Sequence, residues 1–222
     1  MECWQKTTLG WIGGRSDQTR PELLVVVLAD ETTPAGVMRD VVTAWSATLP
    51  RTLFLIFDRV ADRFGIESWL TTALEEAGLP PSRLLLVGVR DAGSFGLTIA
   101  LTARHAGFAG LLAYDAILEG IADQAGPAWR PKIRLIGRNG EGRSNDDLFA
   151  RMIHELSAFG LDVRGTLLLD PGWTPSSIRI GASYLAELSA AALGVPRSGG
   201  DSGSSTQSGS RQPPNIAPAR PR

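Results

Sequence analysis

Residues 82–118 read SRLLLVGVRDAGSFGLTIALTARHAGFAGLLAYDAIL, and this stretch decides the fold class. Leu84–Val89 is an apolar run of strand length, as expected for a strand that is buried on both faces. Ser94–His105 has the composition of a helix, and Phe108–Tyr114 is a second apolar run of strand length. A strand, a helix and a strand in succession predict two parallel strands that are joined by a helical crossover.

The same alternation continues on both sides of this stretch. Apolar runs predict four further strands, and helical spacing predicts four further helices. The expected strands are Leu23–Leu28, Thr52–Phe57, Ile133–Ile136 and Val163–Leu169, and the expected helices are Val37–Trp45, Ile66–Ala77, Asp146–Phe159 and Pro175–Ala192. Ser144 or Asn145 is a suitable N-cap for the helix at Asp146. The sequence therefore predicts a three-layer α/β sandwich with a mostly parallel sheet of about six strands.

Charge and composition exclude several classes of function. The 222 residues contain 22 Lys and Arg against 23 Asp and Glu, for a formal charge of −1. We therefore expect neither a nucleic-acid partner nor binding to an anionic membrane. With one Cys and two His we expect no metal site and no cofactor.

The chain divides into three regions by composition. Residues 1–20 are expected to be an N-terminal extension, residues 21–195 the α/β domain, and residues 196–222 a disordered tail rich in Gly, Ser, Pro and Arg. The longest apolar run, Leu23–Ala29, is too short to span a membrane, and residues 1–9 contain no secretory signal. We therefore expect a cytoplasmic protein.

The stretch at 82–118 resembles the nucleophile-elbow region of the phospholipase/carboxylesterase (acyl-protein-thioesterase-like) family of α/β-hydrolases. The resemblance includes the sequence PPSR at 80–83 and the pair Ala109-Gly110, and it extends over residues 22–193. It implies the α/β-hydrolase fold and, where the catalytic residues are kept, hydrolysis of carboxylic esters or thioesters by a Ser, an acid and a His.

The catalytic positions that the resemblance implies hold other residues here. Arg90 stands two residues after Gly88, where the family has its nucleophilic Ser, and Ala29-Asp30 replaces the His-Gly pair of the oxyanion loop. Gly140 stands at the acid position, and the loop of Trp173 lacks the His that acts as the base. An Arg side chain stays protonated and is not an acyl nucleophile.

Other residues offer substitutes for this machinery. Ser94 lies in the pentapeptide AGSFG, so it is either a shifted nucleophile or a helix N-cap or buried small residue. Glu141 is either a shifted acid or an exposed loop charge. His105 and His154 are expected to be structural or surface residues. His105 lies ~16 Å along its helix from Ser94, which is too far for a hydrogen bond.

We therefore expect a catalytically degenerate α/β-hydrolase-like protein that serves as a binding or assembly module for an unknown partner. Arg90 is expected either to form an ion-pair network with neighbouring carboxylates such as Asp115 or to bind an anion. The alternative is a carboxylesterase or thioesterase that uses Ser94 as its nucleophile.

Overall fold

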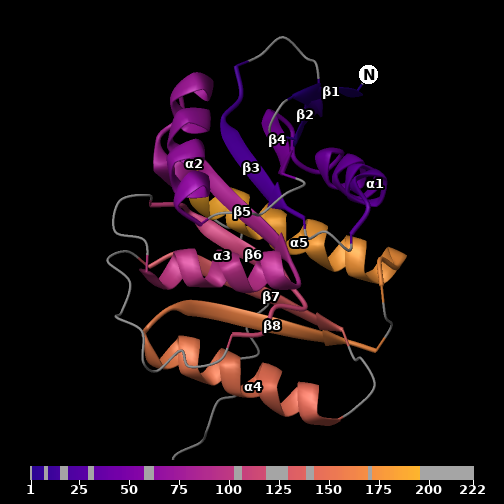
Figure 1. Ribbon diagram of the computed structural model, residues 1–222, viewed down its shortest axis with the longest axis vertical. Helices are drawn as coiled ribbons and strands as arrows, with labels where there is room; N and C mark the ends of the chain where they lie inside the picture. The colour runs from indigo at the N-terminus through magenta and orange to yellow at the C-terminus, as the bar shows by residue number, and fades with distance from the viewer. Residues whose placement is uncertain are drawn as a thin grey trace, which may run out of the picture.

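A central sheet of eight strands runs through the protein, with helices on both of its faces (Figure 1). The computed structural model describes residues 2–7, 10–15, 20–29, 33–57, 63–102, 107–118, 130–138, 143–169 and 172–195. The strands are β1 (Glu2–Thr7), β2 (Gly10–Arg15), β3 (Leu23–Leu28), β4 (Thr52–Phe57), β5 (Leu84–Val89), β6 (Gly110–Tyr114), β7 (Lys132–Arg138) and β8 (Asp162–Leu168). Their order across the sheet is β1-β2-β4-β3-β5-β6-β7-β8.

The mostly parallel sheet that the sequence predicts is confirmed. The six strands from β3 to β8 are the six predicted ones, and all pairings among these six are parallel. The strands β3, β5 and β6 are buried at every position, which explains why their sequences are continuous apolar runs. The edge strand β8 is half exposed and has a more polar sequence.

The N-terminal segment adds two strands that the sequence analysis assigned to an extension. The strands β1 and β2 form an antiparallel hairpin, and β2 pairs antiparallel with β4 through Trp11 and Ile56. Neither ECWQKT nor GWIGGR contains a strong apolar run, so the pattern of the sequence alone did not reveal them. The hairpin covers an edge that β4 would otherwise expose to other strands.

The helices form one layer on each face of the sheet. They are α1 (Ala35–Ser46), α2 (Arg63–Ala77), α3 (Asp91–Thr102), α4 (Arg143–Ala158) and α5 (Pro175–Leu193), with a short 3-10 turn η1 (Pro81–Arg83) before β5. The helices α1 and α5 pack on one face, around Trp45 and Leu185, and α2, α3 and α4 pack on the other, around Leu70, Leu97 and Leu156. The three-layer sandwich is thus as expected.

The helices α1 to α4 begin two or three residues earlier than the sequence predicts, and for α3 and α4 this changes the expected N-caps. The helix α3 begins at Asp91, and the amide of Ser94 already donates to the carbonyl of Arg90, so Ser94 lies in the first turn and is not the N-cap. The helix α4 begins at Arg143, so Ser144 and Asn145 lie inside it and neither caps it. No helix in the described part of the chain is long and apolar enough to cross a bilayer.

Candidate functional site

The residues that follow the parallel strands lie side by side at the carboxyl edge of the sheet. The backbone ladder continues for one residue beyond the strands, because the amide of Ala29 donates to Phe57 O at 3.0 Å and that of Arg90 to Tyr114 O at 2.7 Å. The amide of Asp115 likewise donates to Ile136 O at 2.8 Å. Ala29, Arg90 and Asp115 therefore follow three adjacent strands, β3, β5 and β6.

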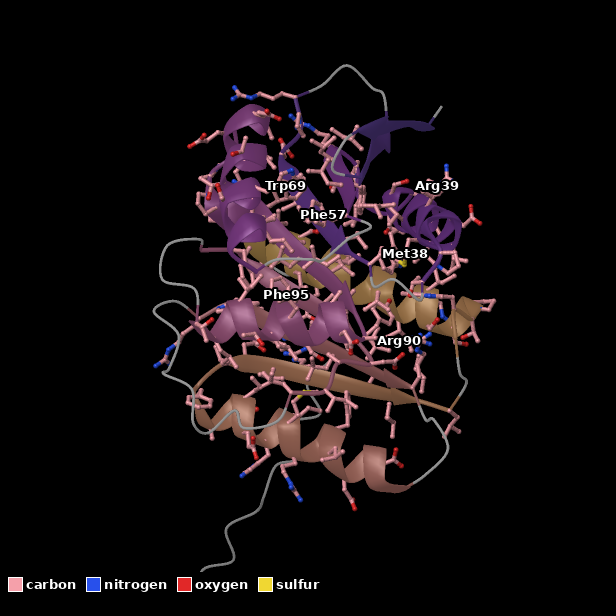
Figure 2. All side chains as sticks on the ribbon, in the orientation of Figure 1. Met38, Arg39, Phe57, Trp69, Arg90 and Phe95 are labelled. Carbon is pink, nitrogen blue, oxygen red and sulfur yellow. The ribbon has the colours of Figure 1, made fainter. Side chains whose placement is uncertain are left out.

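The turn between β5 and α3 is a tight strand-to-helix turn. Arg90 has a φ of 53°, in the left-handed region that non-glycine residues rarely adopt. A Cβ atom at Gly88 would lie 2.5 Å from the Cα of Gly93 and 2.6 Å from the carbonyl oxygen of Ala92, so strand and helix meet too closely for any side chain there. The exposed residue at the apex is Arg90, which lies on the side toward which the arrows of β5 and β8 point (Figures 1 and 2).

The hydroxyl of Ser94 is engaged by the backbone on both sides. Its oxygen donates to the carbonyl of Arg90 at 3.3 Å and accepts the amide of Ile117 at 3.0 Å. These bonds fasten the segment after β6 to the first turn of α3.

Of the two histidines, the structure describes His154 alone. His154 is exposed on α4 and lies ~16 Å along that helix from its first residue, Arg143. His105 lies outside the residues that the structure describes, as do Asp30, Gly140 and Glu141.

A second cluster at the same edge joins Asp115, Arg138 and Trp173. Asp115 has a φ of 48°, and its carboxylate accepts the backbone amide of Arg138 at 2.9 Å and pairs with the Arg138 guanidinium. The guanidinium carbon of Arg138 lies 5.3 Å from the centre of the Trp173 ring, in cation–π geometry. Positive φ values at Arg90 and Asp115 place two strained non-glycine residues on neighbouring strands, as is often seen at functional sites.

Trp173 and Tyr114 close the centre of this edge with aromatic surface. Their ring centres lie 4.7 Å apart, and the Trp173 ring also lies 6.3 Å from that of Trp45. Burial raises the pKa of the Tyr114 phenol far above its usual value, and its hydroxyl donates to the carbonyl of Ser177 at 3.3 Å. Trp173, in the loop where the resemblance implies a base, has no group that accepts a proton at neutral pH.

Sequence reasoning proposed Arg90 as a partner for Asp115 and did not single out Arg138 or Tyr114. Arg138 is the last residue of β7, and its neighbour Gly137 pairs with Leu167 of β8. The signal available in the sequence was a charged residue at the end of a buried strand. Which carboxylate it meets depends on the register of three strands, and a linear sequence does not reveal that.

A cavity of about 380 Å³ opens beside Asp115 and Arg138, between β7, α4 and the segment after β6. Among the described residues, no group of three or more His, Cys, Asp or Glu side chains is placed to hold a metal ion. The charged groups described at this edge thus include the ion pair of Asp115 and Arg138, which lies beside the cavity.

The sequence matches no family model. It also matches no curated protein. Comparison with solved structures, in contrast, finds many similar folds. A fungal esterase from Rhizomucor miehei is 11% identical, with a TM-score of 0.65 over 88% of this chain and 85% of its own. A carboxylesterase from Mesorhizobium loti is 11% identical, with a TM-score of 0.62 over 82% of this chain and 98% of its own.

A phospholipase/carboxylesterase from Dyadobacter fermentans is also similar, at 11% identity and a TM-score of 0.60, over 81% of this chain and 97% of its own. These likenesses show that the chain has the α/β-hydrolase fold. The fold class that the sequence predicts is therefore confirmed. At such low identity the likeness concerns the fold alone, and the activity has to be argued from the site.

Proposed function

We propose that this protein is a catalytically degenerate member of the α/β-hydrolase fold that acts by binding, as a binding or assembly module. The observation that carries the proposal is Arg90, which occupies the strained apex of an elbow whose tight backbone is kept. An α/β-hydrolase uses this apex to expose its nucleophile. A permanently protonated guanidinium attacks no carbonyl carbon.

Two further observations support the loss of ester hydrolysis. The loop that would bring a general base presents Trp173, which packs against Tyr114 and Arg138. Ser94 is bonded to two backbone groups in α3 and lies one helical turn after the apex. General-base catalysis requires a base within hydrogen-bond reach of the nucleophile, and His154 sits far along α4.

Hydrolysis of short p-nitrophenyl esters tests this proposal. The wild-type protein is expected to release p-nitrophenol no faster than Ser94→Ala, and a fluorophosphonate probe is expected to leave the folded protein unlabelled. Turnover that is abolished by Ser94→Ala would contradict the proposal and would favour the alternative, a serine hydrolase with Ser94 as its nucleophile. Thermal unfolding of both proteins controls for loss of structure.

A further inference from the structure

The cavity beside the elbow has the size and lining of a small-molecule site. Its volume of about 380 Å³ lies within the range of ligand pockets, about 300–1,000 Å³. Most of the lining is apolar, and the side chains are those of Ala116, Ile117, Leu118, Leu148, Phe149, Met152 and Leu167. Ile117 and Leu167 keep 50% and 37% of their surface exposed, so the apolar lining extends to the mouth of the cavity.

Glycines on two adjacent strands shape the floor. A Cβ atom at Gly137 would lie 2.9 Å from Leu167 Cδ1 and 3.0 Å from Phe149 Cδ2. A Cβ atom at Gly165 would lie 3.0 Å from the Phe149 ring. The absence of side chains at these two positions lets the Phe149 ring sit low against the sheet, so the hollow above it is built into the packing of β7, β8 and α4.

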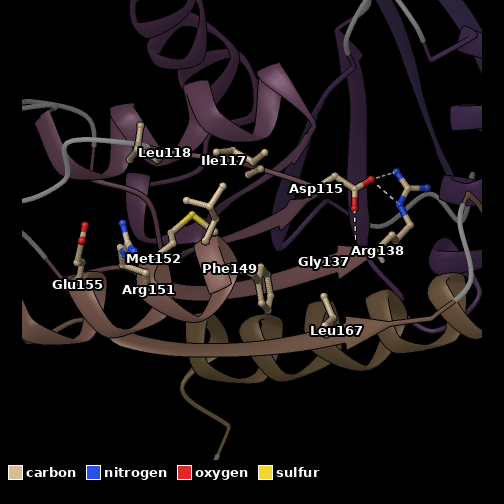
Figure 3. Close-up of a pocket in the computed structure, with 12 residues that line it drawn as sticks. Asp115, Ile117, Leu118, Gly137, Arg138, Phe149, Arg151, Met152, Glu155 and Leu167 are labelled. Carbon is tan, nitrogen blue, oxygen red and sulfur yellow. Dashed lines mark hydrogen bonds and ion pairs between the residues drawn. The ribbon is translucent and has the colours of Figure 1, made fainter. Parts of the chain in front are cut away.

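The charged residues of the lining lie at its two ends, and their formal charges sum to zero. Figure 3 shows the ion pair of Asp115 and Arg138 at one end and Arg151 and Glu155 of α4 at the other, with the apolar side chains between them. Two arginines and two carboxylates give the lining a formal charge of zero. An ion that entered would lose water of hydration and meet no net opposite charge in return.

We propose that this cavity binds a neutral aliphatic compound with an amide-like head group. The cavity holds roughly a dozen groups the size of a water molecule, which corresponds to a chain of medium length. Arg151 can donate to the carbonyl oxygen of the head group, and Glu155, one helical turn later, can accept from its N–H. The inference rests on the proposed function in one respect, namely that the bound compound is held and not hydrolysed.

Three probes of equal chain length test the charge preference. The full chain, labelled with ¹⁵N, is titrated with octanamide, octanoate and octylammonium while the amide signals of Ile117 and Gly137 are followed. Octanamide is expected to bind most tightly, and shortening it to hexanamide is expected to weaken binding roughly fourfold for each methylene removed. Octanoate is nearly isosteric with octanamide, so equal or tighter binding of octanoate overturns the inference, as does the absence of shifts with octanamide.

Substitutions at the cavity test its location. Ile117→Trp fills the mouth and is expected to weaken octanamide binding at least tenfold. Val37→Trp is a matched control, because Val37 is 36% exposed on α1, outside the cavity. This control is expected to bind octanamide like the wild type. Equal binding by the wild type and both variants, with unchanged thermal midpoints, contradicts the assignment of the site.

Single charge removals test the head group. Glu155→Gln leaves the lining with a charge of +1 and is expected to shift the preference toward octanoate by about twofold to fivefold, the size of an exposed ion pair. Arg151→Gln is expected to shift the preference toward octylammonium by a similar factor. Unchanged preferences in both variants overturn the roles of these two residues. Ester turnover is measured separately, so activity would contradict the proposed function without altering the reading of octanamide binding.

Discussion

Two arginines four residues apart on β7 have different partners. Arg134 is completely buried, and its guanidinium bonds to the carboxylates of Asp162 on β8 and Glu187 on α5. Arg138 lies at the carboxyl edge, where it pairs with Asp115 and contacts the face of Trp173. The alternation of side chains along a strand places both arginines on the same face of the sheet.

The difference lies in what each arginine connects. Arg134 also donates to the carbonyls of Ile133 and Asp162, so all of its nitrogens have partners and its burial is tolerated. It joins the edge strand β8 and the helix α5 to the sheet. Arg138 joins Asp115 and Trp173 at the candidate site. Arg138 is also nearly buried, with 6% of its side chain exposed, so the two arginines differ chiefly in the elements that they join.

Removal of Arg134 is expected to have the largest effect on stability. Arg134→Met strands the carboxylates of Asp162 and Glu187, and breaking a buried ion pair from one side costs about 3–5 kcal/mol. Because Asp162 is 43% exposed, we expect about 3 kcal/mol, the lower end of that range. Urea unfolding followed by tryptophan fluorescence measures the change.

Arg138→Met provides the comparison with the edge. We expect it to lower the free energy of unfolding by about 1 kcal/mol, because the Asp115 carboxylate keeps the hydrogen bond from the backbone amide of residue 138 and 22% of its side chain is exposed. If Arg138→Met proves as costly as Arg134→Met, the distinction between the two arginines is wrong.

A single added methyl group is expected to destabilise the turn between β5 and α3. Gly88→Ala places Cβ against the backbone of Gly93 and Ala92, and neither can move without shifting α3 from β5. Such overpacking costs about 1–3 kcal/mol. Gly36→Ala is the control, since a Cβ there meets only Arg39 Nη2 at 3.9 Å. As a helical Gly→Ala change, it is expected to raise stability by about 0.5–1 kcal/mol, and a similar loss in both variants contradicts the prediction.

Acidification tests the Arg134 cluster without a mutation. Burial alone would raise the pKa of Asp162, but the hydrogen bonds and charge of Arg134 outweigh burial and hold that pKa below its usual value. A carboxyl group whose pKa is lowered by folding stabilises the protein above its unfolded-state pKa, and this contribution is lost as the pH falls toward the folded-state pKa.

We therefore expect the unfolding free energy to decrease as the pH falls below about 4. The decrease is expected to be smaller in Asp162→Asn, and urea unfolding from pH 7 to pH 3 measures both proteins. Identical pH profiles would show that Asp162 does not contribute.

Relief of strain at the apex is expected to have the smallest effect. Arg90→Gly removes the steric cost of a left-handed residue, about 1–2 kcal/mol, but adds backbone entropy to the unfolded chain. We expect a net gain of about 0.5 kcal/mol in the free energy of unfolding. A clear loss of stability would mean that the Arg90 side chain makes contacts worth more than the strain of its backbone.

Much of the scaffold could be predicted because its signals are local. The bounds of β3, β4 and β5 match the apolar runs residue for residue, since strands buried on both faces exclude polar side chains. The helix α2 ends at Ala77, as predicted, and Gly78 and Gly160, which follow α2 and α4, both have positive φ values. The N-terminal hairpin was missed because its strands contain no strong apolar run.

The candidate site could be predicted only in part. The counting from Gly88 predicts Arg90 at the apex of the turn after β5, and Arg90 has a φ of 53° in that turn. The pairing of Asp115 with Arg138, the packing of Trp173 on Tyr114 and the bonds of Ser94 to Arg90 and Ile117 were not foreseen. Each of these contacts joins segments whose approach depends on the register and the loops.

The sequence by itself determined the α/β class, the parallel strands and the presence of Arg90 two residues after Gly88. These features depend on burial, periodicity and the identity of one residue, all of which can be read along the chain. Only the tertiary structure decided which charges pair and that Arg134 is completely buried. It also decided that a cavity whose lining carries no net charge lies between β7 and α4. The physical reason is that ion pairs and cavities arise from the distance between side chains of different elements, and that distance is set when the sheet and the helices pack.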